Sequence, residues 1–312
     1  NELFLTQKSG EILKINLNTK EVKNFSHNLK VVQPHWQAGM LDIIYKDGEV
    51  FVSYTEDRGN DKTSTSIARG IIRDESFSEI ENIFQSDSSW NNIHWGSRLM
   101  FKDDLLYASI GERGHGSVAQ DPTSYFGKMI RINKDGSAPK DNPYADNEGW
   151  LPEIYQIGLR NPQGIILNPQ DDEIYITNHG PRGGDFFGKV EAGTNYGWAD
   201  VAWGGIDYDG SIIGDGSAWK EGLLKPIYTW IPSIAVSDMT FYVGDLFPDL
   251  KNKLLITSLK AQKLISLEFD GKKARNETIL FEKIGRVRDV EANSVGEILS
   301  LIHISEPTRL DD

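Results

Sequence analysis

The chain has 312 residues, of which 38% are hydrophobic and 25% charged, a composition typical of a globular protein. Its 33 lysines and arginines are outnumbered by 46 aspartates and glutamates, giving a net charge of −13; nucleic-acid binders usually show the opposite balance, so we exclude nucleic acid as a partner. No apolar run approaches the roughly 18 residues of a membrane span, and the absence of cysteine excludes disulfides and thiolate metal sites.

One short motif recurs along the chain, and each copy predicts a β-strand. A turn is followed by a charged or amide residue and then by four or five mostly apolar residues. The copies are NELFLT (1–6), DGEVFVS (47–53), DDLLYAS (103–109), DDEIYIT (171–177), KNKLLITS (251–258) and VGEILS (295–300). Their spacing of 44 to 80 residues is too wide for a fixed-period solenoid and suits four-stranded propeller blades with loop insertions. No long amphipathic helix is predicted.

Six copies of the motif predict an all-β fold, a six-bladed β-propeller with four-stranded antiparallel blades around a central pocket. We expect residues 1–299 to form a single catalytic domain. The C-terminal tail, residues 300–312, lacks the strand-turn-strand pattern of a final blade. We therefore expect the tail to be foreign to the fold and the closing blade to be incomplete.

Polar residues precede the motif strand at nearly the same distance in four copies. Gln37, His94, Arg160 and Arg286 stand 13 to 15 residues before the position on which the copies align. Equivalent positions in a propeller are related by rotation about one axis, so we expect these side chains to converge on the central pocket. Burying several cations and polar groups there is costly without a ligand of opposite charge.

Longer motifs resemble those of the soluble sugar dehydrogenases that depend on pyrroloquinoline quinone (PQQ), the glucose/sorbosone dehydrogenase family, and most of all its aldose dehydrogenase branch. They are HWGSRL and the SIGERG that follows it, IGLRNPQG (157–164), NHGPRGGD (178–185), GTNYGW (193–198) and GRVRDV (285–290). The resemblance runs from about residue 3 to about residue 299. It implies PQQ- and calcium-dependent oxidation of an aldose sugar at the anomeric carbon to the lactone, with electrons passed to an external acceptor.

The resemblance implies three catalytic residues. His94 matches the family's base, which takes the proton from the anomeric hydroxyl; imidazole suits this task because its ordinary pKa lies near working pH. Glu112 falls where a carboxylate would orient the histidine and fix its tautomer. Arg160 matches the arginine that lies against the quinone carbonyl, where a fixed cation stabilises developing negative charge.

The resemblance also implies a set of cofactor-binding side chains and a metal site. The side chains are those of Gln37, Asn161, Asp185, Lys260, Arg286 and Arg288. PQQ carries three carboxylates, so cations suit its pocket, and Arg286 and Arg288 share a face because they are two apart in a predicted strand. The backbone carbonyls of Gly180 and Pro181 are expected to hold Ca²⁺, which takes oxygen ligands in loose geometry.

Two other interpretations of the sequence stay open. A calcium-dependent lactonase or hydrolase would use the metal and a base without several cations around an anion. A non-catalytic propeller would bind a glycan or a partner, although such a module has no need of a base, His94, facing a cation, Arg160. The resemblance further implies a periplasmic or secreted protein. Neither a monomer nor a dimer is excluded, and the sequence names neither the sugar nor the acceptor.

Overall fold

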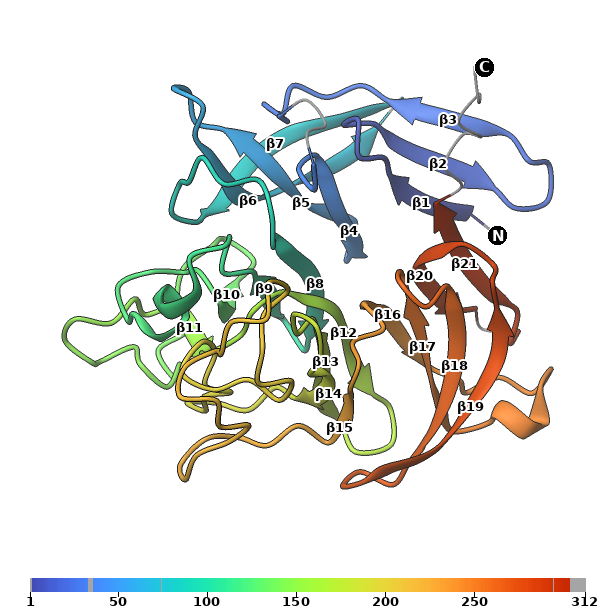
Figure 1. Ribbon diagram of the computed structural model, residues 1–312. Helices are drawn as coiled ribbons and strands as arrows, with labels where there is room; N and C mark the ends of the chain where they lie inside the picture. The colour runs from blue at the N-terminus through green and yellow to red at the C-terminus, as the bar shows by residue number, and fades with distance from the viewer. Residues whose placement is uncertain (1, 33–35, 74, 294, 304–312) are drawn as a thin grey trace, which may run out of the picture. The chain divides into compact units, whose positions relative to one another are not determined.

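The structure is a computed structural model that describes residues 2–32, 36–73, 75–293 and 295–303 (Figure 1). The chain divides into two compact units, and each is described here by itself. The first unit consists of Asn1–Pro162, Glu191–Asp200 and Gly222–Leu224. The second consists of Gln163–Val190, Val201–Glu221 and Lys225–Asp312.

The first unit contains three antiparallel sheets in which strands that follow one another in the sequence pair. The first sheet is β1 (Glu2–Thr6), β2 (Ile12–Asn16) and β3 (Val22–Phe25). The second is β4 (Met40–Lys46), β5 (Glu49–Asp57), β6 (Thr63–Arg73) and β7 (Ser76–Gln85). The third is β8 (Gly96–Lys102), β9 (Leu105–Ile110), β10 (Lys128–Asn133) and β11 (Ile154–Gln156), with a 3₁₀ helix, Gly116–Gln120, between β9 and β10.

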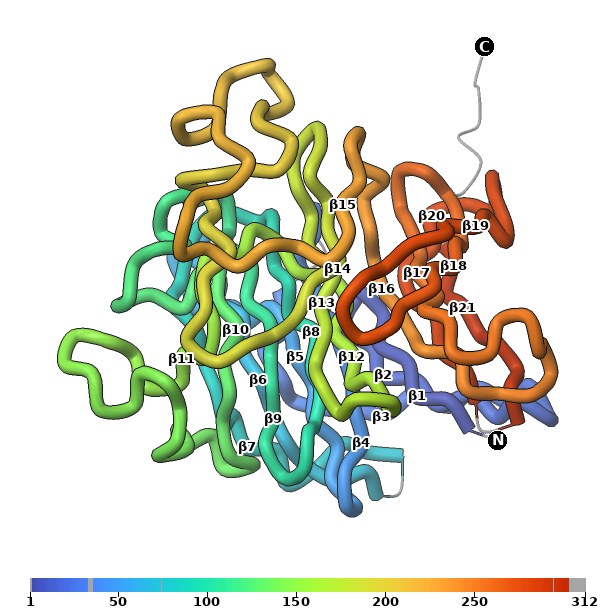
Figure 2. The backbone as a smooth tube through the Cα atoms, turned by 90° about the horizontal axis from the view of Figure 1, so that it is seen from below, coloured from blue at the N-terminus to red at the C-terminus, as the bar shows by residue number. Residues whose placement is uncertain are grey.

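The second unit continues the same arrangement, and the backbone tube of Figure 2 follows its strands along the chain. One sheet is β12 (Pro162–Asn168), β13 (Glu173–Asn178), β14 (Asp185–Lys189) and β15 (Tyr228–Trp230), of which only Pro162 belongs to the first unit. The next is β16 (Val236–Phe241), β17 (Lys253–Ser258), β18 (Lys263–Phe269) and β19 (Ala274–Glu282), with a 3₁₀ helix, Pro248–Leu250, between β16 and β17. The last is the pair β20 (Arg286–Ala292) and β21 (Ile298–His303).

Antiparallel four-stranded meanders that follow one another along a chain are the blades of a β-propeller, so the predicted all-β propeller with four-stranded blades is confirmed. The predicted count of six blades is wrong for the described residues. Five sheets have three or more strands, whereas the sixth copy of the motif lies in the two-stranded pair β20–β21. Each copy of the motif marks a single strand of a sheet. Residues 286–303 form only two strands, so the sixth copy does not indicate a complete sixth blade.

Part of the predicted C-terminal tail is paired in the second unit. Strand β21 runs to His303, and its residues Ser300 and Leu301 pair with Val290 and Asp289 of β20. Residues 304–312 lie outside the described residues, so the prediction that they are foreign to the fold stays a prediction. No helix within the described parts of the chain is long and apolar enough to cross a membrane.

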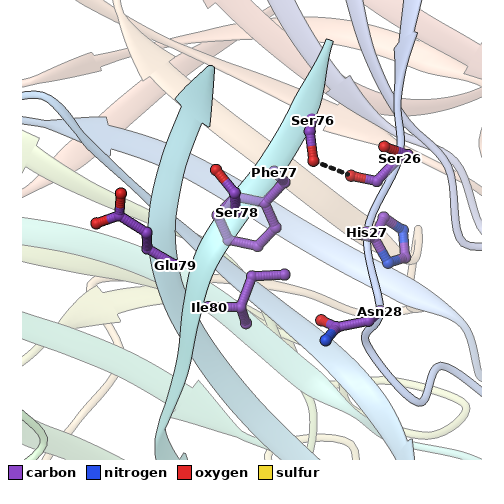
Figure 3. Close-up of a pocket in the computed structure, with 8 residues that line it drawn as sticks. All are labelled: Ser26, His27, Asn28, Ser76, Phe77, Ser78, Glu79 and Ile80. Carbon is purple, nitrogen blue, oxygen red and sulfur yellow. Dashed lines mark hydrogen bonds between the residues drawn. The ribbon is translucent and has the colours of Figure 1, made fainter. Parts of the chain in front are cut away.

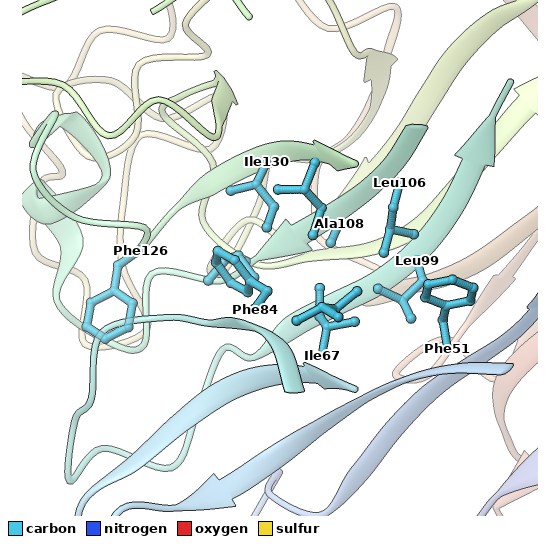
Figure 4. Close-up of a cluster of buried hydrophobic side chains, with 11 residues drawn as sticks. Phe51, Ile67, Phe84, Leu99, Leu106, Ala108, Phe126 and Ile130 are labelled. Carbon is cyan, nitrogen blue, oxygen red and sulfur yellow. The ribbon is translucent and has the colours of Figure 1, made fainter. Parts of the chain in front are cut away.

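The repeated motif forms the second strand of every complete sheet. In β9, β13 and β17 every residue after the first is buried, because both faces of these strands pack against other side chains. In the first unit, Phe51 of β5 meets Leu106 and Ala108 of β9 in one buried cluster (Figure 4). A strand buried on both faces carries apolar residues at consecutive positions, which explains why the motif reads as a continuous apolar run.

The hydroxyl at the end of the motif joins one sheet to the next within each unit. Ser53 at the end of the second copy donates to the Ser97 carbonyl of β8, 2.6 Å away, and Thr177 donates in the same way to the Ser237 carbonyl of β16 at 3.0 Å. The Ser53 hydroxyl also accepts the N–H of Asp42 at 3.0 Å, where β4 has a bulge. These contacts fix the first strands of the sheets, and the loops before those strands carry predicted site residues.

Candidate active site

His94 and Glu112 meet because they stand at the same end of one hairpin. His94 lies two residues before β8 and Glu112 two residues after β9, and the two strands are antiparallel. The flanking loops are joined where Gly111 N–H donates to the Trp95 carbonyl at 3.0 Å. A Cβ atom on Gly111 would lie 1.9 Å from the His94 carbonyl oxygen, so only glycine permits this approach.

The side chains of His94 and Glu112 form a buried hydrogen-bonded pair. Nδ1 of His94 bonds Oε1 of Glu112, and the Gly116 N–H donates to Oε2 at 2.6 Å. The imidazole is 13% exposed and the carboxylate 2%. Burial alone raises the pKa of Glu112, but the His94 hydrogen bond and charge, the Gly116 N–H and the charge of Arg160 together lower it. The carboxylate therefore stays ionised and favours the His94 tautomer with its hydrogen on Nδ1.

Arg160 and Asn161 hold these two loops from the segment that leads into β12. The Arg160 carbonyl accepts the Glu112 N–H at 2.9 Å, and Asn161 Oδ1 accepts the Gly96 N–H at 3.1 Å. Arg160 and Asn161 are only 5% and 3% exposed. The positive charge of Arg160 is thus fixed beside the carboxylate that orients His94.

Gln37 reaches the same place from the loop before β4. Its Oε1 accepts the His94 N–H at 2.8 Å, and its own N–H donates to the Asn92 carbonyl at 3.3 Å. The Gln37 carboxamide therefore hydrogen-bonds the main chain of the predicted base, a contact that the sequence did not predict.

Trp198 is a site residue that the sequence analysis did not assign. The guanidinium carbon of Arg160 lies 5.3 Å from the centroid of its ring. Two main-chain bonds place the residue: its N–H donates to the Gly158 carbonyl at 3.1 Å, and its carbonyl accepts Gln120 Nε2 at 2.7 Å. The indole N–H is buried and has no hydrogen-bond partner among the described residues. Trp198 is the last residue of the motif GTNYGW, and its place in that motif was the signal in the sequence that could have identified it.

In the second unit, Asp185 shapes the predicted metal loop. Its carboxylate accepts the Gly180 N–H at 2.8 Å on one oxygen and the Val236 N–H at 3.2 Å on the other, and the residue is fully buried. A Cβ atom on Gly180 would lie 2.4 Å from the Gly183 carbonyl oxygen, so the loop through Pro181 is tightly folded. Across the described residues, no group of three or more histidine, aspartate or glutamate side chains could hold a metal ion.

Lys260 hydrogen-bonds the same short segment as Asp185, residues 234–236. Its N–H donates to the Ile234 carbonyl at 3.1 Å, two residues before Val236, and its side chain is exposed. The second unit therefore brings the Gly180 loop and the loop of Lys260 together through residues 234–236.

Arg286 and Arg288 are both exposed in β20, while Val287 between them is buried. Both side chains reach the surface, and the pairing of β20 with β21 is irregular at Arg288, between Val287 and Asp289. Partial desolvation of its guanidinium and then the charge of Arg286 lower the pKa of Arg288. Two like charges held this close favour an anionic ligand.

The predicted residues fall into one group in each unit. The first unit brings its group together around the hairpin of β8 and β9: Gln37, His94, Glu112, Arg160 and Asn161. The second unit holds the others: Gly180, Pro181, Asp185, Lys260, Arg286 and Arg288. Convergence of the two groups on one pocket stays a prediction.

A cavity of about 380 Å³ between β3 and β7 contains none of the predicted residues (Figure 3). Its lining is Ser26, His27, Asn28, Ser76, Phe77, Ser78, Glu79 and Ile80. Two of its polar groups bond the main chain: His27 Nε2 bonds the Gly10 carbonyl at 2.6 Å, and Ser76 Oγ donates to the Ser26 carbonyl at 3.4 Å. These residues join the first sheet to the second.

The fold is a β-propeller, and its first unit carries a histidine bonded to a carboxylate and a buried arginine beside them. The family profile described as Glucose / Sorbosone dehydrogenase matches residues 1–308. The chain belongs to this family of sugar dehydrogenases, and the resemblance seen in the sequence motifs is confirmed.

Individual relatives agree with this assignment. The chain is 33% identical over 281 residues to aldose sugar dehydrogenase YliI of Escherichia coli (strain K12), covering 86% of this chain and 76% of that protein. The crystal structure of the soluble aldose sugar dehydrogenase from Escherichia coli in the apo-form is similar with a TM-score of 0.88 at 30% identity, covering 95% of this chain and 88% of that one. Quinoprotein glucose dehydrogenase B of Acinetobacter calcoaceticus is 27% identical over 235 residues, 65% of this chain and 48% of that protein.

Proposed function

We propose that this sugar dehydrogenase oxidises an aldose at its anomeric carbon to the lactone, with PQQ and Ca²⁺ as cofactors and an external electron acceptor. The observation that carries the proposal is the buried His94–Glu112 pair beside Arg160. The names of two relatives support it, because one is an aldose sugar dehydrogenase and another a quinoprotein. A periplasmic or secreted location is part of the proposal and rests on the family resemblance.

The described residues fit a cofactor with three carboxylates. The buried indole N–H of Trp198 has no partner among them, and Arg160 adds a fixed, nearly buried cation. Lys260, Arg286 and Arg288 add three exposed cations from the second unit. Trp198 and Arg160 of the first unit would hold PQQ, and Lys260, Arg286 and Arg288 stay predicted cofactor ligands of the second unit. The chemistry that the cofactor supplies when bound is acceptance of a hydride at a quinone carbonyl, with Ca²⁺ acting as a Lewis acid.

The carbonyls of Gly180 and Pro181 would hold Ca²⁺. Calcium accepts backbone oxygens as ligands, so this loop needs no cage of carboxylates. Both oxygens of Asp185 are taken up by backbone N–H groups, so we assign Asp185 to shaping the loop and not to direct contact with PQQ.

His94 acts as the base. With hydrogen on Nδ1, its lone pair is on Nε2, which takes the proton from the anomeric hydroxyl as the C–H bond gives up its hydride. Glu112 holds the ring in this tautomer and stabilises the imidazolium that forms, and burial strengthens that attraction. Because the ring is 13% exposed, it can return the proton to water. Gln37 and Asn161 hold the main chain on either side of the base.

The test is a dye-linked dehydrogenase assay on apoprotein with a panel of aldoses, with and without PQQ and Ca²⁺. We expect activity only when both are present. His94→Gln should lower kcat by about 10²- to 10⁴-fold, the usual contribution of a positioned base, while PQQ still binds in an absorbance titration.

The matched control is His27→Gln, since His27 is a partly buried histidine in the same unit that bonds the Gly10 carbonyl. This variant should keep wild-type kcat. Sugar oxidation by His94→Gln at the wild-type rate, or no oxidation by the wild type with both cofactors, would refute the proposal.

A further inference from the structure

Arg113, the residue after Glu112, is a charged side chain that the proposed reaction does not use. It has 0% exposure, although arginine is almost never fully buried unless it is paired. Removing a guanidinium from water is costly, so the contacts that compensate for its burial indicate its role.

Arg113 holds the main chain that leads into the predicted base. Its Nε donates to the Ile93 carbonyl at 3.2 Å, and its Nη2 donates to the Asn91 carbonyl. Ile93 and Asn91 stand one and three residues before His94, whose φ of +53° lies in the left-handed region. A non-glycine residue persists there only where its surroundings hold it.

The residue that follows His94 is held by the same guanidinium. The guanidinium carbon lies 3.3 Å from the centroid of the Trp95 ring, a stacked cation–π contact. Nη2 also donates to the Thr63 hydroxyl at 3.0 Å, which ties the group to β6. One planar group thus fixes residues 91, 93 and 95 around the base and anchors them to a neighbouring sheet.

We propose that Arg113 is a positioning residue that holds the 91–95 segment so that Nδ1 of His94 meets the Glu112 carboxylate. The inference rests on the proposed role of His94 as the base. Lysine cannot replace Arg113, because an ammonium group lacks the planar fork that bonds two carbonyls and stacks on an indole. Burial lowers the pKa of Arg113 to about 9 against the opposing effect of Glu112, so the group is charged at neutral pH.

The chain offers a matched control in Arg131 of β10, which is 7% exposed. Its guanidinium carbon lies 4.9 Å from the Tyr155 ring centroid, and its Nε donates to Asn142 Oδ1 at 2.6 Å. It is therefore another buried arginine over an aromatic ring in the same unit, but it holds the loop of residues 141–155. Arg131→Met should affect stability without affecting His94.

The first measurement is an NMR titration of the His94 imidazole in the apoprotein, assigned with His94→Gln. In Arg113→Met we expect the midpoint to move to lower pH, because a displaced Glu112 no longer stabilises the imidazolium. Arg131→Met should titrate as the wild type does. An unchanged midpoint in folded Arg113→Met would overturn the proposal.

The second measurement is steady-state kinetics of the holoenzyme. A misplaced base should lower kcat by about 10²-fold in Arg113→Met, while KM stays within roughly threefold. Should this variant fail to fold, Arg113→Lys takes its place, and full kcat in that variant counts against the proposal. The titration needs no cofactor, so it decides on Arg113 even if the wild type oxidises no sugar and the proposed function is wrong.

Discussion

Glu112 links the stability of the protein to pH through a single carboxylate. The contacts with His94 and Gly116 lower its pKa in the folded state. A carboxylate with a lowered folded pKa contributes stability above its unfolded pKa of about 4.3, and that contribution is lost as pH falls through the lowered value.

We therefore expect Glu112→Gln to flatten the acid side of the stability curve. Urea unfolding from pH 7 to pH 3 should show a smaller loss of unfolding free energy in the variant than in the wild type. Glu148→Gln, which changes an exposed carboxylate, serves as the control. Parallel pH curves for Glu112→Gln and the wild type would show that the pair adds no stability.

The sequence predicted residues whose chemistry is visible in a motif, and it missed those whose role depends on packing. His94 and Glu112 were assigned as a pair from the resemblance alone, and the structure shows them hydrogen-bonded to each other. Arg113 stands between Glu112 and Gly114 in the motif SIGERG, but the sequence analysis assigned it no role. Its role follows only from the approach of residues 91–95, which strand pairing creates.

Among the elements, the repeated motif predicted strands correctly but not complete sheets. Its apolar run identifies the buried second strand of each blade, because that strand packs on both faces. Outer strands such as β19 are mostly exposed and leave no comparable signal. The number of blades therefore could not be read from the number of motif copies.

The hydroxyl at the end of the motif joins one sheet to the next, and its effect on the stability of the protein can be measured. Ser53→Ala leaves the Ser97 carbonyl and the Asp42 N–H without their buried partner. We expect a loss of about 1–3 kcal/mol in the free energy of unfolding, the usual cost of such groups. Urea denaturation measures it.

Ser211→Ala removes an exposed hydroxyl that bonds only Asp209 within a turn, and we expect almost no change in this control. Equal stability of the two variants would mean that the buried hydroxyl does not tie β5 to β8.

For the whole molecule, the net charge of −13 predicts how the salt concentration changes the rate at which an external acceptor re-oxidises the reduced enzyme. An acidic protein repels anionic acceptors and attracts cationic ones, and this long-range effect is screened as the Debye length falls from about 30 Å at 0.01 M salt to about 8 Å at 0.15 M. Raising the salt concentration should speed oxidation by ferricyanide several-fold and slow oxidation by a cationic phenazine dye. Stopped-flow rates at saturating sugar measure both, and identical salt responses would contradict the prediction.

The hairpin of β8 and β9 has a consequence for the history of the protein. The proposed base and the carboxylate bonded to it stand at the same end of one hairpin, in the loops that flank one pair of strands in a repeated series of sheets. A duplicated ancestral repeat could gain this pair through substitutions at two loop positions, without altering the buried strands that hold the sheets together. The positions that would carry the chemistry and the strands that carry the packing are thus separate within this hairpin.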